Sequence, residues 1–187
     1  AYIFAVIASP VGSYFKGGPA PISIWVSENY TRAAIGGTGA VKCGGNYAAS
    51  LRAQAEAIDR GCDQVVFLDA IERRYVEELG GMNVFFVFDD GSLSTPPLGT
   101  ILPGITRDSI ITLARDSGTP VREEPYTIDQ WRSDAASGKL REAFACGTAA
   151  VISPIGKVCS AHGDFTINGG AAGPAACHQL EGVALDL

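Results

Sequence analysis

The sequence predicts a mixed α/β fold in which much of the strand pairing is antiparallel. Short apolar runs rich in β-branched and aromatic residues alternate irregularly with helical patterns along the 187 residues, without strict βαβ repetition. An Asp89-Asp90-Gly91 turn directly follows one of these runs and indicates a β-hairpin. No internal repeat or low-complexity linker divides the sequence, so we expect one domain over residues 1–187.

In the first half of the chain, strands are expected wherever β-branched and aromatic residues run together. The segments of this kind are 1–9, 22–26, 64–68 and 83–88. Apolar residues at helical spacing predict a helix over residues 47–60, which Gly61 ends. Residues 10–21 and 31–45 are expected to be loops, and the second of them holds five glycines, which indicates unusual backbone geometry.

The second half begins with a predicted helix over residues 106–117, which Gly118 ends. A short strand is expected over residues 121–124. Thr127 to Gln130 have the pattern of a capping box, which opens a short helix through Trp131. Residues 148–152 are expected to form a strand that Pro154 ends, and the signals weaken after Lys157.

Charge and hydropathy exclude several classes of partner. The formal net charge is −6 and no cluster of Lys and Arg stands out, so nucleic acids and anionic membranes are poor partners. No apolar run is long enough to predict a transmembrane helix.

The five cysteines are odd in number and irregularly spaced, which favours reduced thiols in a cytoplasmic protein. Cys159 and His162, with Cys177 and His178, could be taken for a zinc site. The spacing of the second pair is wrong for one, so we expect no metal.

The apolar run that opens at Ala1 resembles a buried strand and lacks the basic residues of a signal peptide. A native chain seldom begins inside a core strand. We therefore expect the sequence to be part of a longer protein, with Asp186-Leu187 as a similarly arbitrary end.

The sharpest local feature is Lys42, which lies between two glycine clusters in GGTGAVKCGGNY. A phosphate-loop motif would need glycine before this lysine and Ser or Thr after it, but Val41 and Cys43 stand there. The dinucleotide fingerprint also fails, because Lys42 replaces its third glycine. Lys42 is either a solvated surface lysine or a lysine that apolar walls desolvate and make nucleophilic towards a carbonyl.

A second feature, LPGITRD over residues 102–108, places small residues at the start of a predicted helix. The free N–H groups of Ile105 and Thr106, the Thr106 hydroxyl and the helix dipole would favour a phosphate there. The alternative is an ordinary capped helix.

The adjacent acids Glu77 and Glu78 form a third feature, because they lie in an extended apolar stretch. Neighbouring side chains of a strand point to opposite faces, so one of the two is expected to point inward and to need a cationic partner. The residues alone do not decide which acid it is.

Four blocks together resemble the branched-chain amino acid aminotransferases of fold type IV, a family of pyridoxal-phosphate enzymes. They are GGTGAVKCGGNYAAS, EELGGMNVFFV, TPPLGTILPGITRD and EAFACGTAAVISP, in that order and spacing. The resemblance runs from Pro10 to about Ile155. It implies the family's large C-terminal cofactor-binding domain, a pseudo-barrel of strands with surrounding helices, without the smaller N-terminal domain.

The resemblance implies a cofactor site built on Lys42, which would form the Schiff base with pyridoxal 5′-phosphate and move the proton between substrate and cofactor. Glu78, rather than Glu77, matches the acid that keeps the pyridine nitrogen protonated. Tyr47 would bind the phenolic oxygen. The phosphate would be held by Arg32, Ile105 and Thr106, with Thr148 also at the cofactor.

For substrate, the resemblance implies that N–H groups of Thr148 and Ala149 bind the carboxylate and that Tyr14 lines the apolar pocket. The reaction would exchange an amino group between Leu, Ile or Val and 2-oxoglutarate, in a cytoplasmic homodimer of amino-acid biosynthesis. Ala150 and Ser153 replace a Cys-x-x-Cys redox pair of eukaryotic members, and Gly81 replaces a Thr of many relatives.

Two alternatives remain open on the sequence. The first is another fold type IV enzyme, either a D-amino acid aminotransferase or an aminodeoxychorismate lyase. The second is a non-catalytic fragment, since the isolated chain would leave its site open to water and is expected to turn over little substrate.

Overall fold

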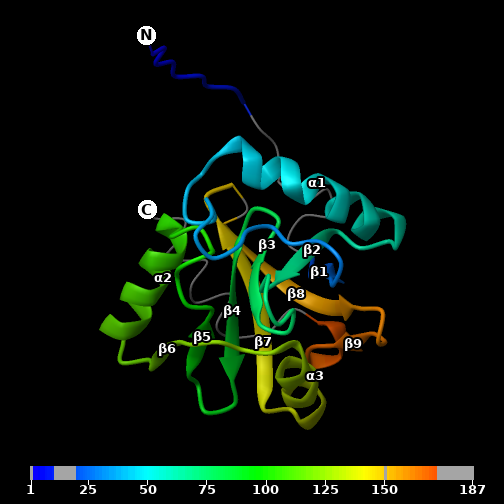
Figure 1. The fold of residues 1–187 in the computed structure, drawn as a ribbon. Coiled ribbons are helices and arrows are strands. Elements are labelled where there is room, and N and C mark those ends of the chain that lie inside the picture. Colours follow the sequence, from blue (N-terminus) through cyan, green and yellow to red (C-terminus); the bar gives the residue numbers. More distant parts are fainter. Residues whose placement is uncertain (1, 11–19, 150, 172–187) are drawn as a thin grey trace.

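The computed structural model describes residues 2–10, 20–149 and 151–171. Within them, strands form one mixed sheet and three α-helices lie outside it (Figure 1). The strands are β1 Ile22–Ser27, β2 Gln64–Leu68, β3 Val76–Leu79, β4 Asn83–Phe88, β5 Leu93–Thr95, β6 Val121–Glu123, β7 Leu140–Gly147, β8 Val151–Cys159 and β9 Phe165–Thr166. The helices are α1 Gly44–Asp59, α2 Ile105–Asp116 and α3 Ile128–Ser137, with a 3-10 turn at Asn168–Gly170.

The sheet has the strand order β3-β2-β1-β8-β7-β4-β5-β6, and β9 pairs with β8. β1 is parallel to both β2 and β8, and β5 is parallel to β6. The other five pairs are antiparallel. β3 and β4 are joined by residues 80–82 and contact each other, although four strands separate them in the sheet order. The sheet from β3 to β4 is therefore strongly curved. The predicted mixed sheet with much antiparallel pairing is confirmed.

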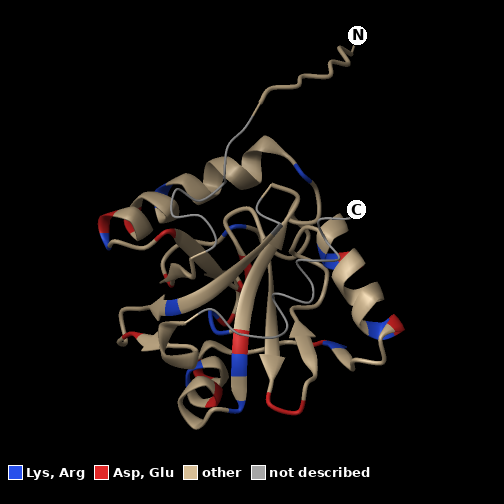
Figure 2. Cartoon of the chain, turned by 180° about the vertical axis from the view of Figure 1, so that it is seen from behind, with Lys and Arg blue, Asp and Glu red and all other residues tan. Residues whose placement is uncertain are grey.

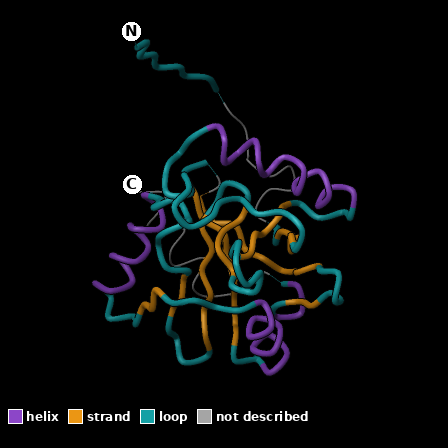
Figure 3. Tube along the Cα trace, viewed as in Figure 1, coloured by secondary structure: helices purple, strands orange, loops and turns teal. Residues whose placement is uncertain are grey.

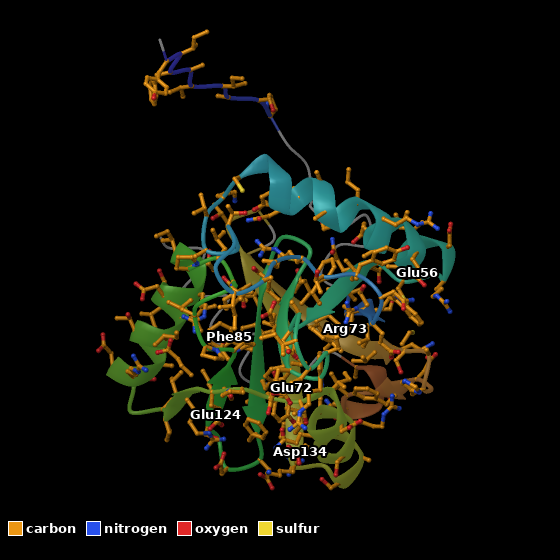
Figure 4. The ribbon with its side chains drawn as sticks, in the orientation of Figure 1. Glu56, Glu72, Arg73, Phe85, Glu124 and Asp134 are labelled. Atoms are coloured by element: carbon orange, nitrogen blue, oxygen red, sulfur yellow. The ribbon has the colours of Figure 1, made fainter. Side chains whose placement is uncertain are left out.

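Each helix covers its own part of the sheet, which divides the apolar interior into three clusters. α2 packs on β4 and β7 over Phe85, which Figure 4 labels, and over Phe144. The stacked rings of Phe85 and Phe144 have centroids 5.2 Å apart. α1 covers β1 and β2, and α3 buries Trp131 in the largest cluster. In Figure 3 the loops gather at the end of the sheet where α1 and α2 begin. The first turns of α1 and α2 therefore lie beside the loops at this end of the sheet.

Several expected elements match the structure closely. β2 and β4 have the predicted bounds, and the turn at Asp89-Asp90-Gly91 joins β4 to β5 as expected. α1 begins at Gly44 and α2 at Ile105, which are within three residues of their predicted starts. β2 and β4 match because almost every residue of each is buried. The bounds of α1 match less directly, because Leu51 and Ile58 of its apolar pattern are exposed and its buried residues are Asn46, Ser50, Ala53 and Ala57.

The expectation that Pro154 ends a strand is wrong, because β8 runs on to Cys159. The structure shows why proline is tolerated there. Residues 151–154 pair with β7, and residues from Ile155 onward pair with β1 across a register shift. Pro154 lies where the strand changes partner, and a missing N–H interrupts the ladder least at such a place.

The predicted strand over residues 1–9 is also wrong for the residues described there. Residues 2–9 pair with no strand, and Figure 1 shows them extending away from the sheet. Tyr2 is 105% exposed and Phe4 is 92% exposed. The apolar pattern indicates a segment suited to burial, but a strand also needs a neighbour, and the pattern does not supply one.

The charged residues are distributed around the molecule. Figure 2 shows Lys and Arg interspersed with Asp and Glu. Among the described helices, none is long and apolar enough to cross a membrane.

The capping box of α3 is confirmed, which allows a stability prediction. Gln130 N–H donates to Thr127 Oγ1 at 3.1 Å, and Thr127 N–H donates to Gln130 Oε1 at 3.0 Å. Thr127→Ala should lower the free energy of unfolding by about 1 kcal/mol, because a first-turn N–H loses its partner. Chemical denaturation would measure this, and Thr127→Ser serves as the control that retains the cap. Equal losses in both variants would contradict the capping role.

Candidate active site

A cavity of about 270 Å³ lies between the glycine-rich loop, β3, β4, the start of α2 and the end of β7. It gathers five residues that the sequence singled out: Lys42, Glu78, Ile105, Thr106 and Thr148. A wider cavity of about 550 Å³, beside α3 and β9, holds none of the predicted site residues. The smaller cavity is therefore the candidate active site.

The loop that carries Lys42 is fixed from two sides. Asn46, buried in the first turn of α1, donates from Nδ2 to the carbonyls of Thr38 and Val41 at 2.8 Å each. Thr38 Oγ1 in turn donates to Asn46 Oδ1 at 2.8 Å. On the other side, a Cβ on Gly39 would lie 1.8 Å from the carbonyl oxygen of Thr100, so only glycine allows this approach. The loop is thus an ordered platform.

Lys42 lines the cavity, and of the two alternatives that the sequence left open, its exposure fits a lysine in contact with water. Lys42 is exposed, and the adjacent Val41 is 57% exposed. The loop lies at the surface, where Ile35 is also largely exposed. Next to it, hydrogen bonds from Thr38 and from the backbone N–H of Asn46 hold the pKa of the Cys43 thiol below its ordinary value.

Glu77 and Glu78 point to opposite faces of β3, as predicted. Glu78 is 2% exposed and lines the candidate site. Glu77 is half-buried, lines a separate cavity and accepts a hydrogen bond from Thr100 Oγ1. The inward acid is therefore Glu78, and it has the cationic partner that its burial requires: Arg32 Nη1 lies 2.6 Å from Glu78 Oε1.

Two opposed effects determine the charge of Glu78. Burial is the largest effect and raises the pKa of its carboxyl; with the lowering by the Arg32 guanidinium and the Leu102 N–H included, the pKa is about 7. The Leu102 N–H donates to Glu78 Oε1 at 3.0 Å. The nearby Glu77 carboxylate, whose own pKa burial also raises, adds a repulsion that favours protonation of Glu78. Burial and the charge of Glu77 therefore oppose ionisation of Glu78, and the ion pair with Arg32 supports it.

The start of α2 has the features of an anion site. Gly104 occupies the N-cap and supplies no side-chain cap, and Asp108 N–H is bonded back to Gly104 O at 3.0 Å. The N–H groups of the first turn have no partners within a helix, and the helix dipole adds positive character. Ile105 is 78% exposed and Thr106 is half-buried, and both line the cavity.

The other predicted residues are placed less uniformly. Tyr47 is half-buried in α1, and a Cβ on Gly81 would lie 3.7 Å from its ring. Gly81 itself lines the cavity. Thr148 and Ala149 are exposed in the turn between β7 and β8. Tyr14 lies outside the described residues, so its role stays a prediction.

Arg32 is not among the residues that line the cavity. Its guanidinium contacts Glu78, and Arg32 Nη1 also donates to the carbonyl of Thr100 at 3.4 Å. Its expected contact with phosphate stays a prediction, while the structure gives it a carboxylate partner that the sequence did not indicate.

Sequence reasoning missed three residues at this cavity: Asn83, Cys146 and Gly147. Asn83 Nδ2 donates to the carbonyl of Leu102 at 3.0 Å and approaches Glu78 Oε2 at 3.5 Å. The sequence feature that could have indicated Asn83 is its position as the one polar residue, at the start of the apolar strand β4. Burial raises the pKa of the Cys146 thiol to about 12, so it stays neutral.

No group of three or more potential metal ligands occurs among the described residues, and Cys177 and His178 lie outside them. The groups that line the cavity include the amine of Lys42, the buried carboxylate of Glu78 and the start of α2. This set can hold an anionic ligand at one end and a cationic or proton-bearing group at the other.

Comparisons with known proteins agree with this geometry. The family model for class IV amino-transferases matches residues 19–158. A branched-chain-amino-acid aminotransferase of Mycolicibacterium smegmatis is 58% identical over 176 residues, covering 92% of this chain and 48% of the relative. The chain thus spans about half the length of the curated relatives it matches.

Similar solved structures give the same result. The branched-chain amino acid aminotransferase of Escherichia coli superposes with a TM-score of 0.79 at 34% identity, covering 96% of this chain and 55% of the other. A branched-chain amino acid aminotransferase from T.th., described as complexed with N-(5′-phosphopyridoxyl)-L-glutamate, has a TM-score of 0.73 at 34% identity, covering 89% and 51%. By fold, by site and by the extent of the family match, this chain belongs to the class IV aminotransferases.

Proposed function

We propose that the full-length protein transfers the amino group between the branched-chain L-amino acids Leu, Ile and Val and 2-oxoglutarate, with pyridoxal phosphate as cofactor. One observation carries the proposal: a single cavity unites Lys42, Glu78 and the first turn of α2. The branched-chain substrate class follows the names of the similar proteins.

The residues present fit this cofactor. Lys42 offers an exposed amine that would hold the aldehyde group. Glu78 Oε1 is engaged by Arg32 and by Leu102 N–H. Among the described residues, Oε2 has only the amide of Asn83 at 3.5 Å, so Oε2 would accept a hydrogen bond from a ring N–H. The uncapped start of α2 suits a phosphate.

Each end of the cavity has a separate chemical task. When bound, pyridoxal phosphate supplies an aldehyde for the amino group and a ring that withdraws electrons from Cα of the amino acid. Lys42 would move the proton at Cα, since it is the basic side chain that lines the cavity within the described residues. Glu78 would hold the proton on the ring nitrogen, and Thr106 would hold the phosphate in place.

The turn between β7 and β8 would supply the substrate contact. Thr148 and Ala149 are exposed there, and Thr148 lines the cavity. Their backbone N–H groups would bind the carboxylate of the amino acid. A homodimer and a cytoplasmic location belong to the same proposal, as does a second, smaller domain in the complete protein.

Assays of the full-length protein would test the function directly. L-Leu, L-Ile and L-Val with 2-oxoglutarate should be turned over far faster than D-Ala or aminodeoxychorismate. After borohydride reduction, mass spectrometry should find the cofactor attached to the peptide that contains Lys42. A preference for D-Ala, or attachment at another lysine, would overturn the proposal.

Thr106→Ala should weaken cofactor binding more than the chemical step. A hydrogen bond to a charged group contributes about 1.5–3 kcal/mol, so cofactor affinity should fall by about one to two decades. Dissociation of cofactor from the full-length variant, measured by fluorescence, tests this expectation. Thr106→Ser is the matched control that keeps the hydroxyl, and an unchanged affinity in Thr106→Ala would indicate a residue of α2 with no role in binding.

A further inference from the structure

The Arg32–Glu78 pair is unusual because both partners are almost completely removed from water. Each side chain is 2% exposed, and Arg32 Nη1 lies 2.6 Å from Glu78 Oε1. Arg32 precedes the glycine-rich loop, whereas Glu78 lies on β3, so the fold brings them together across the chain. Charges are seldom buried without a specific partner, and a buried carboxylate that loses its cation is strongly disfavoured.

The two carboxylate oxygens of Glu78 have different hydrogen-bond partners. Oε1 receives Arg32 and the backbone N–H of Leu102 at 3.0 Å. Within the part of the chain that the structure describes, Oε2 has only the amide of Asn83 at 3.5 Å, and the same Nδ2 donates at 3.0 Å to the carbonyl of Leu102. One oxygen is therefore anchored in the protein, and the other remains able to accept a hydrogen bond from a group in the cavity.

The groups around Glu78 leave Arg32 as the cation that can keep it charged. Glu77, next to it on β3, repels a negative charge, and the neutral Cys146 thiol on β7 contributes none. Lys42 lines the same cavity, but it is exposed to water, which screens its charge. Asn83 on β4 is uncharged. Arg32 is the cation in ion-pair contact with Glu78 among the described residues.

We propose that Arg32 is a positioning residue that keeps Glu78 ionised and turns its second oxygen, Oε2, into the cavity. The inference deepens the proposed function, on which its second test rests, and gives Arg32 a task other than contact with phosphate. Arg32 contacts both Glu78 and the carbonyl of Thr100 through one nitrogen, Nη1. The ionisation of Glu78 should therefore depend on a positive charge at this position and not on the forked shape of the guanidinium. Arg32→Lys should therefore keep much of the effect, and Arg32→Met should lose it.

The first test needs no catalysis. The Glu78 carboxyl would be titrated by NMR in full-length, cofactor-free protein labelled with ¹³C at glutamate carboxyls, with Glu78→Gln to assign the signal. In Arg32→Met the midpoint should rise by at least about one pH unit, since a nearby opposite charge shifts a carboxyl by about that much or more. In Arg32→Lys it should stay close to the wild-type value. An unmoved midpoint in Arg32→Met would overturn the proposal.

The second test uses the loaded enzyme. In Arg32→Met the acidic limb of the kcat profile should move up by about the same one pH unit, which lowers kcat several-fold at neutral pH. KM for the amino acid should change far less, and raising the pH should restore kcat. If the NMR midpoint moves but the wild-type protein shows no transamination, the proposed function fails while the role of Arg32 stands.

Arg107 provides the matched control. It is another buried arginine that pairs with a carboxylate, donating to Glu123 and to the carbonyl of Pro96 at 2.9 Å each. Arg107→Met should reduce stability without moving the Glu78 midpoint. A shift equal to that of Arg32→Met would show that the loss of any buried arginine perturbs Glu78, which would overturn the specific role.

If Arg32→Met does not fold, a double variant distinguishes the loss of the Arg32 charge from the loss of its packing. The double variant Arg32→Met/Glu78→Gln removes the unpaired charge together with its partner, so it should melt at a higher temperature than Arg32→Met alone. A double variant that is no more stable would mean that Arg32 acts only through packing, and the proposal would be wrong.

Discussion

Lys42→Ala in the full-length protein should reduce transamination by at least about 10²–10⁴-fold, the contribution of general acid–base catalysis alone. The reason is positional. Lys42 is the basic side chain that lines the cavity opposite Glu78 and the start of α2, on a loop that Asn46 and Gly39 hold in place. Alanine removes both the amine that would hold the cofactor and the base that would move the Cα proton.

Steady-state rates of the purified variant, with cofactor in excess, would measure this effect. Lys139→Ala is the matched control, because Lys139 is exposed beside Asp134, directly before the start of β7, whereas the cavity lies at the end of that strand. It should keep wild-type activity. A Lys42→Ala variant that retains more than a few per cent of activity would show that another amine does the chemistry.

Glu78→Gln should lower kcat by about 10² or more, as the removal of one preorganised charged group at a reacting centre typically does. Glutamine preserves the shape of the side chain but not its charge, so the ring nitrogen would no longer be kept protonated. Glu77→Gln should cost far less, because Glu77 lies on the opposite face of β3 and contacts Thr100 outside the site.

Glu77→Gln is the matched control for Glu78→Gln, since both variants change one carboxyl to an amide on the same strand. Cofactor content, measured by absorbance, should remain near wild type in each, so that kcat reports the chemical step. Equal losses of kcat in Glu77→Gln and Glu78→Gln would mean that the strand face has been assigned wrongly.

The elements that the sequence predicted well are those whose residues share one environment. β2 and β4 are buried along almost their whole length, so their apolar runs mark their bounds. β7 was missed because Arg141 and Glu142 interrupt its start, although every residue from Glu142 to Cys146 is buried. β3 was recognised only as an extended stretch, because two acids make up half of it.

Residue patterns alone singled out three features: a lysine in a glycine-rich loop, two adjacent acids on opposite strand faces, and small residues at the start of a helix. They left open whether the lysine is a surface residue and whether the helix is an ordinary capped one. The three features are local properties, since a few neighbouring residues define each of them. Family resemblance then assigned Glu78 rather than Glu77 to the cofactor. The structure places Glu78, and not Glu77, at the candidate site, and its contact with the cofactor stays a prediction.

Which side chains meet is a property of the folded chain and could not be read from local patterns. The pairing of Arg32 with Glu78, the contact of Asn83 with Leu102, the surface position of Lys42 and the continuation of β8 past Pro154 all depend on the order of strands in the sheet. Burial and charge pairing are set by groups distant in sequence. Local patterns show that a buried acid needs a cation, but folding selects Arg32 to supply it.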